Sequence, residues 1–264
     1  MKSSLAPLNV LVVINSLTPA VRSFSNTLLP WFEHYGIPFD VVDLLGEPLP
    51  EDLPDFPLVV LGHAGLDDQG TRLGPDGLKQ LRAAVEMGSG LVSFDPRLSC
   101  RLLDVSGQVK EGQEVQALDV AAGHPITERY THGQRIGLVS PLALSQVPDG
   151  EKLIVGAGGT LPLLSVQQHG LGRLVHWAAA AWMDSSVLGP LGGLDSAFWR
   201  SIVWAARKPF CMRGFPPVVT MRVDDVAGWG RLWQREPLYW VRDAVKAGFK
   251  PWLGLFIYNL EERT

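Results

Sequence analysis

Short apolar runs alternate with amphipathic segments along the first hundred residues. Two segments, 21–35 and 74–90, carry apolar residues at helical spacing, and Gly36 and Gly88 stand where the two helices are expected to end. Four continuous apolar runs each predict a strand buried on both faces of a parallel sheet: 9–15, 38–45, 57–63 and 90–96. This β-α-β-β-α-β order indicates an open, mostly parallel, doubly wound α/β sheet.

The pattern changes after residue 98. Residues 98–150 are polar and irregular, which predicts either an insertion or a set of edge strands. Three apolar segments joined by glycine turns follow within 151–182, and they favour an antiparallel extension of the sheet. A helix is expected at 195–206, with Asp195 as its N-cap.

A domain boundary is predicted where the composition of the chain changes again. Residues 207–216 place two prolines and a glycine within a basic cluster. The residues that follow, 217–259, predict a strand, a loop, a helix and a second strand, which together form one βαβ unit. We therefore expect one domain at 1–207 and a smaller, incomplete unit at 215–264.

Composition narrows the class of protein. Hydrophobic residues make up 46% of the chain and charged residues 19%, which is typical of a packed globular protein. The net charge of -4 argues against nucleic acid or an anionic membrane as a partner, and no apolar window is long enough for a membrane-spanning helix. Two distant cysteines, Cys100 and Cys211, favour reduced thiols and a cytoplasmic location.

Three motifs in the first domain resemble the class I glutamine amidotransferase-like family. They are GHPITERY at 123–130, QQHGLGRLVHWAAAAW at 167–182 and FWRSIVWAARKPF at 198–210. The resemblance implies a flavodoxin-like sheet. In active members it also implies a cysteine on a tight turn between a strand and a helix, with a histidine and an acid nearby.

The nucleophile of that family is missing from this sequence. The corresponding turn falls near Phe94 and Asp95, where no cysteine stands, and Cys100 comes five residues later without flanking glycines. His176 is not followed by an acid two residues on. The sequence therefore predicts no nucleophile and no glutaminase activity.

Polar residues at predicted strand ends are the remaining candidates in the first domain. His63 and Asp95 each follow a buried strand, and open α/β sheets bind ligands in the crevice beyond the carboxyl ends of their strands. A ligand-lining role and a purely structural role stay open for both residues. Asp67 and Asp68 are expected in a solvated loop.

The second unit contains adjacent aspartates in TMRVDDVAGWG, residues 220–230. This segment resembles the first motif of the polysaccharide deacetylase family, and the unit resembles the start of a (β/α) barrel. The resemblance implies that Asp224 is the general base and that Asp225 ligates a divalent metal, commonly zinc. A structural role also stays open, in which Asp224 caps the loop or pairs with Arg222 or Arg231.

The metal site of that family is incomplete in this sequence. The family completes it with a His-x-x-x-His motif, but no histidine follows His176. Because a catalytic zinc usually has three protein ligands, no cofactor is certain, and zinc is expected only if the missing ligands are supplied.

Two interpretations of function follow. In the first, the chain is a non-catalytic, amidotransferase-like accessory domain of a carbohydrate-active, polysaccharide deacetylase-like protein. In the second, it is a small-molecule hydrolase or a ligand-binding module that uses the crevice near His63 and Asp95. Whether the chain is an enzyme stays open. The missing nucleophile and the incomplete metal site favour a chain without enzymatic activity. The expected partner is a carbohydrate or another small molecule, and nine tryptophans also favour a homo-oligomer. Whether the native protein continues beyond Thr264 is likewise open.

Overall fold

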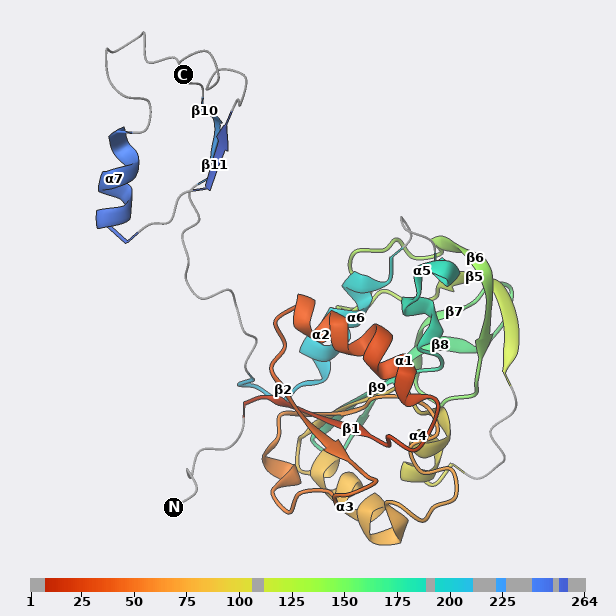
Figure 1. Ribbon diagram of the computed structural model, residues 1–264. Coiled ribbons are helices and arrows are strands. Elements are labelled where there is room, and N and C mark those ends of the chain that lie inside the picture. The colour runs from red at the N-terminus through yellow and green to blue at the C-terminus, as the bar shows by residue number, and fades with distance from the viewer. Residues whose placement is uncertain are drawn as a thin grey trace. The chain divides into compact units, whose positions relative to one another are not determined.

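The computed structural model divides the chain into two compact units, Met1–Arg213 and Gly214–Thr264 (Figure 1). It describes residues 8–105, 112–188, 193–210, 222–226, 239–248 and 252–255. We call Met1–Arg213 unit 1 and Gly214–Thr264 unit 2, and describe each by itself. None of the helices in these ranges is long and apolar enough to cross a membrane.

A nine-stranded mixed sheet forms the centre of unit 1, in the order β2-β1-β3-β4-β9-β8-β7-β5-β6. Its five parallel strands are β2 (Phe39–Asp43), β1 (Val10–Ile14), β3 (Leu58–Leu61), β4 (Gly90–Ser93) and β9 (Gly172–Trp177). Four antiparallel strands extend it: β8 (Pro162–His169), β7 (Glu151–Gly156), β5 (Gln113–Val120) and β6 (Arg135–Leu144). The predicted α/β sheet with an antiparallel extension is confirmed, but β9, which was expected in that extension, runs parallel to β4 and belongs to the parallel half.

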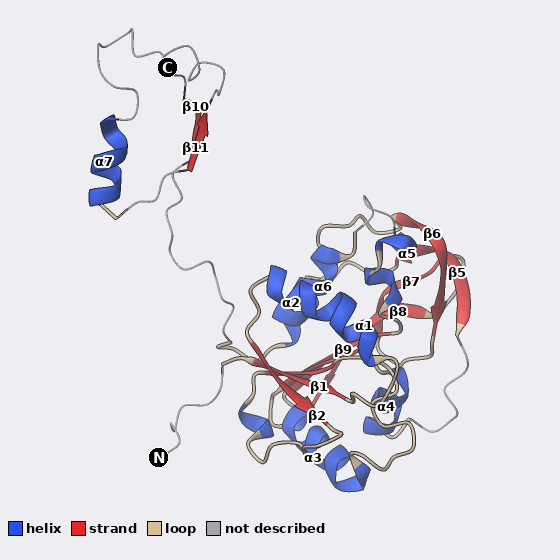
Figure 2. Ribbon diagram, viewed as in Figure 1, coloured by secondary structure: helices blue, strands red, loops and turns tan. Residues whose placement is uncertain are grey.

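Helices cover both faces of the parallel half (Figure 2). One face carries α1 (Val21–Ser23), a π-helical turn (Phe24–Leu28), α2 (Leu29–His34) and α6 (Asp195–Ala205). The opposite face carries α3 (Gly74–Glu86) and α4 (Pro96–Leu102). Three short helices complete the unit: Leu53–Asp55, Ala181–Met183 and α5 (Ser185–Leu188).

The two faces bury different side chains. On the α1/α2/α6 face, Phe94 stacks on Trp177 with ring centroids 6.1 Å apart, and Trp182 lies 4.7 Å from Trp177. On the α3/α4 face the packing is mainly aliphatic, from residues such as Leu81 and Leu174. Because both faces of the sheet are covered, its inner strands need apolar residues at successive positions, which explains their continuous apolar runs.

The predicted helix at 21–35 is present but is interrupted by the π-helical turn. Pro30 has no N–H to donate to the carbonyl of Asn26, and its ring crowds that carbonyl in a regular α-helix. The wider turn avoids this contact, and the Leu29 N–H donates to the Phe24 carbonyl instead.

Two expectations for the less regular parts can be compared with the structure. Of the strands expected at 98–150 as an insertion or as edge strands, β6 lies at the edge of the sheet, whereas β5 pairs on both sides, with β6 and β7. The helix α4 was not expected. The prediction that Asp195 is an N-cap is wrong, because Leu194 precedes the helix and Asp195 is its first residue. An acidic residue in the first turn still interacts favourably with the helix dipole.

Unit 2 contains two parallel strands and one helix among its described residues. The strands β10 (Arg222–Val226) and β11 (Trp252–Leu255) pair in parallel, and α7 (Tyr239–Lys246) lies between them in the chain. The pairing shifts register between Val223 and Val226, so Asp224 and Asp225 stand at an irregularity within the strand. The backbone therefore forms a βαβ unit.

Candidate functional site

An open cleft lies at the carboxyl edge of the parallel strands in unit 1. The chain leaves β1 toward the α1/α2 face and leaves β3 toward the α3 face. Open α/β sheets bind ligands where neighbouring connections diverge in this way. The cleft has a volume of about 520 Å³. It is lined by Thr18, Pro19, Ala20, Ala64, Gly65, Asp68, Asp95, Pro96, Arg97 and Ser145.

Asp95 lies in the wall of this cleft and is 1% exposed. It caps α4, because its Oδ1 accepts the Leu98 N–H at 3.0 Å. Its Oδ2 accepts the Leu66 N–H at 2.9 Å, which ties the loop after β3 to the start of α4. Burial raises the pKa of the Asp95 carboxyl, while these two N–H groups act to lower it.

His63 is not among the residues that line the cleft, although its neighbour Ala64 is. Its side chain is fully buried, its Nε2 accepts the Asn15 N–H at 3.0 Å, and its Nδ1 lies 2.9 Å from the Ala64 carbonyl. The bond to Nε2 assigns the proton to Nδ1, which then donates to Ala64. Burial also lowers the pKa of His63. The neutral imidazole therefore joins the end of β3 to the end of β1 through Nε2, while Nδ1 bonds to the adjacent backbone carbonyl.

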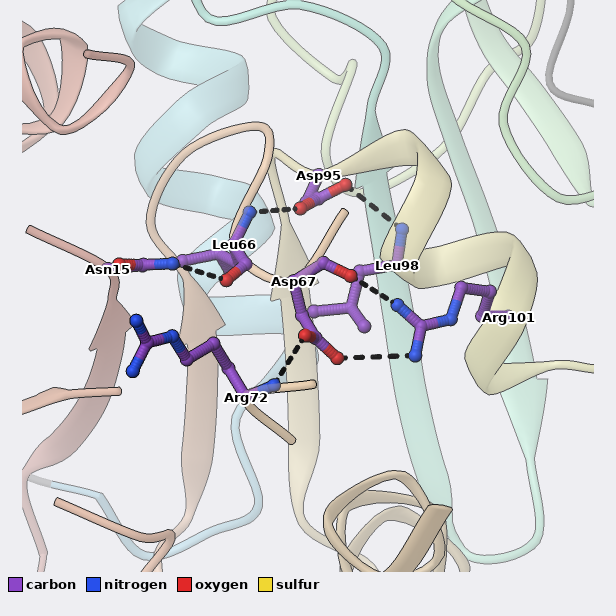
Figure 3. A network of polar contacts seen from close by, with 7 residues as sticks. All are labelled: Asn15, Leu66, Asp67, Arg72, Asp95, Leu98 and Arg101. Carbon is purple, nitrogen blue, oxygen red and sulfur yellow. Dashed lines mark hydrogen bonds and ion pairs between the residues drawn. The ribbon is translucent and has the colours of Figure 1, made fainter. Parts of the chain in front are cut away.

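A network of polar contacts holds the loop between β3 and α3 (Figure 3). The Asn15 side-chain amide donates to the Leu66 carbonyl at 2.9 Å, so the Leu66 backbone is held between Asn15 and Asp95. Arg101 of α4 reaches both the carbonyl and the carboxylate of Asp67, at 2.5 and 3.2 Å. The loop is thus fixed to β1 on one side and to α4 on the other.

The expectation of a solvated loop at Asp67 and Asp68 is only half right. Asp67 is 3% exposed, and its Oδ1 also accepts the Arg72 N–H at 2.8 Å. Asp68 is exposed at the cleft and lies 3.5 Å from the Arg97 guanidinium. The sequence could not reveal the difference, because the partner of Asp67 lies 34 residues further along the chain.

The thiol chemistry of the resembled family has no counterpart in this cleft. The turn between β4 and α4 falls at Phe94 and Asp95, as predicted, and Asp95 has an ordinary extended backbone. Cys100 lies within α4, and burial raises the pKa of its thiol. His176 is buried on β9, and burial lowers its pKa to about 3. Cys211 lies outside the described residues.

The HPIT segment is explained as a structural turn. The Thr127 hydroxyl donates to the Ala122 carbonyl, while the His124 N–H donates to that hydroxyl. The Ile126 N–H donates to His124 Nδ1, and Arg200 of α6 donates to the Pro125 carbonyl. The segment therefore fastens the turn to α6, and none of its residues lines the cleft.

The aspartates predicted to act as base and metal ligand belong to unit 2. Asp224 and Asp225 lie in β10, and their side chains are outside the described residues. The described parts of the chain contain no group of three His, Cys, Asp or Glu residues able to hold a metal ion. Two adjacent carboxylates do not fit zinc, which usually has at least three protein ligands.

Sequence reasoning missed several residues of the cleft, including Thr18, Arg97 and Ser145. Thr18 and Arg97 follow the ends of β1 and β4, so the rule that ligands bind beyond strand ends could have indicated them. Ser145 follows β6, on the antiparallel side of the sheet, and nothing in the local sequence connects it with the cleft.

Sequence comparison identifies no relative of this chain. No family model matches it, and no curated protein sequence matches it significantly. Neither comparison supports a polysaccharide deacetylase domain.

Solved structures with a similar fold do exist. A ThuA-like protein from Bacteroides uniformis ATCC 8492 is 14% identical, with 77% of this chain and 94% of that chain covered and a TM-score of 0.50. Cytoplasmic protein STM1381 from Salmonella typhimurium LT2 is 14% identical, with 75% and 100% covered and a TM-score of 0.51. Cytoplasmic protein STM3548 from Salmonella typhimurium is 12% identical, with 76% and 100% covered and a TM-score of 0.50.

These similarities identify a fold. The sheet and helices of unit 1 have the mixed α/β architecture of ThuA-like proteins, which is a class I glutamine amidotransferase-like fold. At 12–14% identity the likeness defines the fold alone. Function has to be argued from the cleft.

Proposed function

We propose that unit 1 is a non-catalytic module that binds a small molecule, such as a carbohydrate, in the cleft at the carboxyl edge of its sheet. The observation that carries the proposal is the buried carboxylate of Asp95 in the cleft wall, at the turn where an active amidotransferase-like enzyme has its cysteine. Without a thiolate there, the cleft lacks the nucleophile with which that family forms its acyl-enzyme, but it can still bind a ligand.

The construction of the cleft supports binding. The loop after β3 is fixed by Asn15, Asp95 and Arg101 before any ligand arrives. A ligand therefore does not have to order this wall, which reduces the entropic cost of binding.

The wider setting that we propose is an accessory role in a carbohydrate-active, polysaccharide deacetylase-like protein. Its support is the βαβ order of unit 2 together with the Asp224-Asp225 pair in β10. Since the ligand set is incomplete, we expect residues 1–264 alone to bind no stoichiometric zinc. Metal analysis after zinc loading and desalting checks this, and one tightly held zinc ion per chain would contradict it.

A second candidate function is hydrolysis of a small molecule with Asp95 as the acid or base. It is favoured by the raised pKa of Asp95, which moves the carboxyl toward the range useful for proton transfer near neutral pH. His63 could not assist in its present state, because both of its nitrogens are engaged. Turnover of any cleft ligand by the wild-type chain, lost in Asp95→Asn, would establish this function in place of pure binding.

The binding proposal is tested by a small-molecule library and a variant that fills the cleft. Ala64 is exposed in the lining, so Ala64→Trp should abolish the binding of genuine cleft ligands while the fold is retained. Ala247→Trp changes an exposed alanine of unit 2 and serves as the control. If no compound binds to the wild-type chain, or if Ala64→Trp binds every hit as well as wild type, the proposal is wrong.

A further inference from the structure

An ionisable side chain joins two of the loops that line the cleft. The loop after β1 contributes residues 18–20 to the lining, and the loop after β3 contributes residues 64 and 65. His63 belongs to the second loop, and its Nε2 accepts the N–H of Asn15, the first residue of the other loop, at 3.0 Å. The position of one cleft wall relative to the other therefore depends on the state of this imidazole.

The bond to Asn15 exists only while His63 is neutral. Its Nδ1 lies 2.9 Å from the Ala64 carbonyl, which can only accept, so the single ring proton belongs on Nδ1. A second proton has to go on Nε2, where it would face the Asn15 N–H with no acceptor between them. A bound proton and the Asn15 bond exclude each other. Because His63 is 0% exposed, protonation requires one of the two loops to move.

The charges around His63 favour uptake of a proton once the ring is exposed. In the closed structure, burial is the largest effect and lowers the pKa of His63. The bond to the Ala64 carbonyl and the carboxylates of Asp95 and Asp43 act in the opposite direction, since each favours the charged ring. Movement of a loop away from the ring removes the burial penalty. The open form therefore binds a proton more readily than the closed form.

The loop after β1 has fewer contacts to lose than the loop after β3. None of residues 16–20 is buried. Apart from His63, two contacts join this loop to its neighbours: the Asn15 side chain donates to the Leu66 carbonyl at 2.9 Å, and the Ser16 N–H donates to Asp43 Oδ1 at 3.0 Å. The loop after β3 is also fastened to α4. Local opening of an exposed segment costs less free energy than global unfolding, so the loop after β1 is the one that moves.

We propose that His63 is a pH-sensitive switch of the cleft, in which protonation releases Asn15 and opens the loop of residues 15–20 while the rest of unit 1 stays folded. The inference goes beyond the proposed function, because it concerns the shape of the cleft whether or not a ligand binds there. The closed form holds His63 neutral, whereas the exposed ring of the open form titrates near the ordinary value of about 6.5. Closing is therefore favoured above about pH 6.5 and is progressively lost as the pH falls below it.

Hydrogen exchange of the Asn15 amide tests the switch between about pH 7 and pH 5 in the full chain labelled with nitrogen-15. Protection factors correct for the pH dependence of exchange itself, and the buried Val60 of β3 is the internal reference. We expect the protection of Asn15 relative to Val60 to fall by up to about tenfold for each pH unit below about 6.5. A constant ratio would overturn the inference, including the case in which both amides lose protection together through global unfolding.

The variant His63→Gln shows whether this group is the one that titrates. Glutamine offers a carbonyl oxygen to the Asn15 N–H and does not ionise, so the protection ratio should not depend on pH, whatever the overall stability of the variant. Asp95 is left unchanged, which separates its titration from that of His63. The exposed residue His34 gives the matched control, His34→Gln, which should behave as wild type. Equal pH dependence in His63→Gln and wild type would contradict the switch.

The nitrogen-15 signals of the His63 ring give a second readout in the wild-type chain. They should show the neutral Nδ1–H form at pH 7, and the imidazolium should grow in step with the loss of Asn15 protection. A His63 imidazolium beside a still protected Asn15 amide would overturn the inference. Because exchange is measured without ligand, compounds that bind in the cleft while the protection ratio stays constant refute the switch alone. A ratio that falls as expected while no compound binds refutes the binding proposal alone.

Discussion

At the residue scale, the candidate site depends on buried polar groups that have specific partners. Asp95 is the central one, because it caps a helix, holds a loop and lines the cleft at once. The sequence could indicate Asp95 and His63 from their places at strand ends. It could not separate their roles, because His63 is engaged by Asn15, which lies 48 residues away in the sequence, as well as by the adjacent Ala64.

Asp95→Asn should destabilise unit 1 although the side chain keeps its size. Asparagine has one acceptor oxygen, so either the Leu66 or the Leu98 N–H would face an NH₂ group. We expect a loss of roughly 1–3 kcal/mol in the free energy of unfolding, measured by urea denaturation. Asp76→Asn is the control, and equal stability of Asp95→Asn and wild type would show that the carboxylate does not hold the loop.

His176 should make unit 1 sensitive to acid. Burial lowers its pKa to about 3, below the unfolded value of about 6.5, so the folded state holds it neutral while the unfolded state takes up a proton. Stability should therefore fall as the pH drops from about 6.5 toward 3, by up to roughly 1.4 kcal/mol per pH unit from this group.

The substitution His176→Gln tests this linkage. Urea unfolding between pH 4 and 7 should show a shallower dependence on pH than in wild type, because glutamine does not titrate. The exposed residue His34 provides a matched control, His34→Gln. An unchanged slope in His176→Gln would mean that His176 is not held neutral in the folded protein.

At the element scale, local pattern was a good guide to strands and a poor guide to short helices. The strands β1, β3 and β4 were predicted because burial on both faces leaves continuous apolar runs. The helix α4 was missed, although Asp95-Pro96 is an N-cap followed by a proline at the first helical position, which is a start signal. Its seven residues are too few for a clear periodic pattern.

The position of α4 also depends on a contact that no local pattern reveals. The Arg101 side chain joins α4 to the loop after β3 through Asp67. A double-mutant cycle with Asp67→Asn and Arg101→Gln should give a coupling energy of about 1–3 kcal/mol, since the Asp67 carboxylate is buried. The exposed pair Arg135 and Asp119 is the control and should couple more weakly. Equal coupling in the two pairs would contradict a structural role for the contact between Asp67 and Arg101.

At the scale of the whole molecule, the chain forms two units, and the candidate chemistry of each is separate. The cleft at the carboxyl edge of the sheet belongs to unit 1, whereas the aspartate pair belongs to unit 2. Because unit 1 has its own sheet and core on both faces, we expect residues 1–213 to fold without unit 2.

Truncation after Arg213 checks this expectation. The shortened chain should unfold cooperatively in urea, at the midpoint seen for unit 1 in the full chain. It should also give the same amide chemical shifts for residues around the cleft. Loss of cooperative unfolding would show that unit 1 depends on residues beyond 213.

The central claim is that the cleft at the carboxyl edge of the sheet is the ligand site of unit 1. Its most direct test is a map of amide chemical-shift changes over the full chain on addition of the tightest compound from the library. The account predicts that the largest changes fall on Thr18, Gly65 and Arg97. Unit 1 has another, smaller pocket of about 190 Å³, lined by residues that include Asp149 and Thr160. Changes centred on that pocket instead would contradict the account.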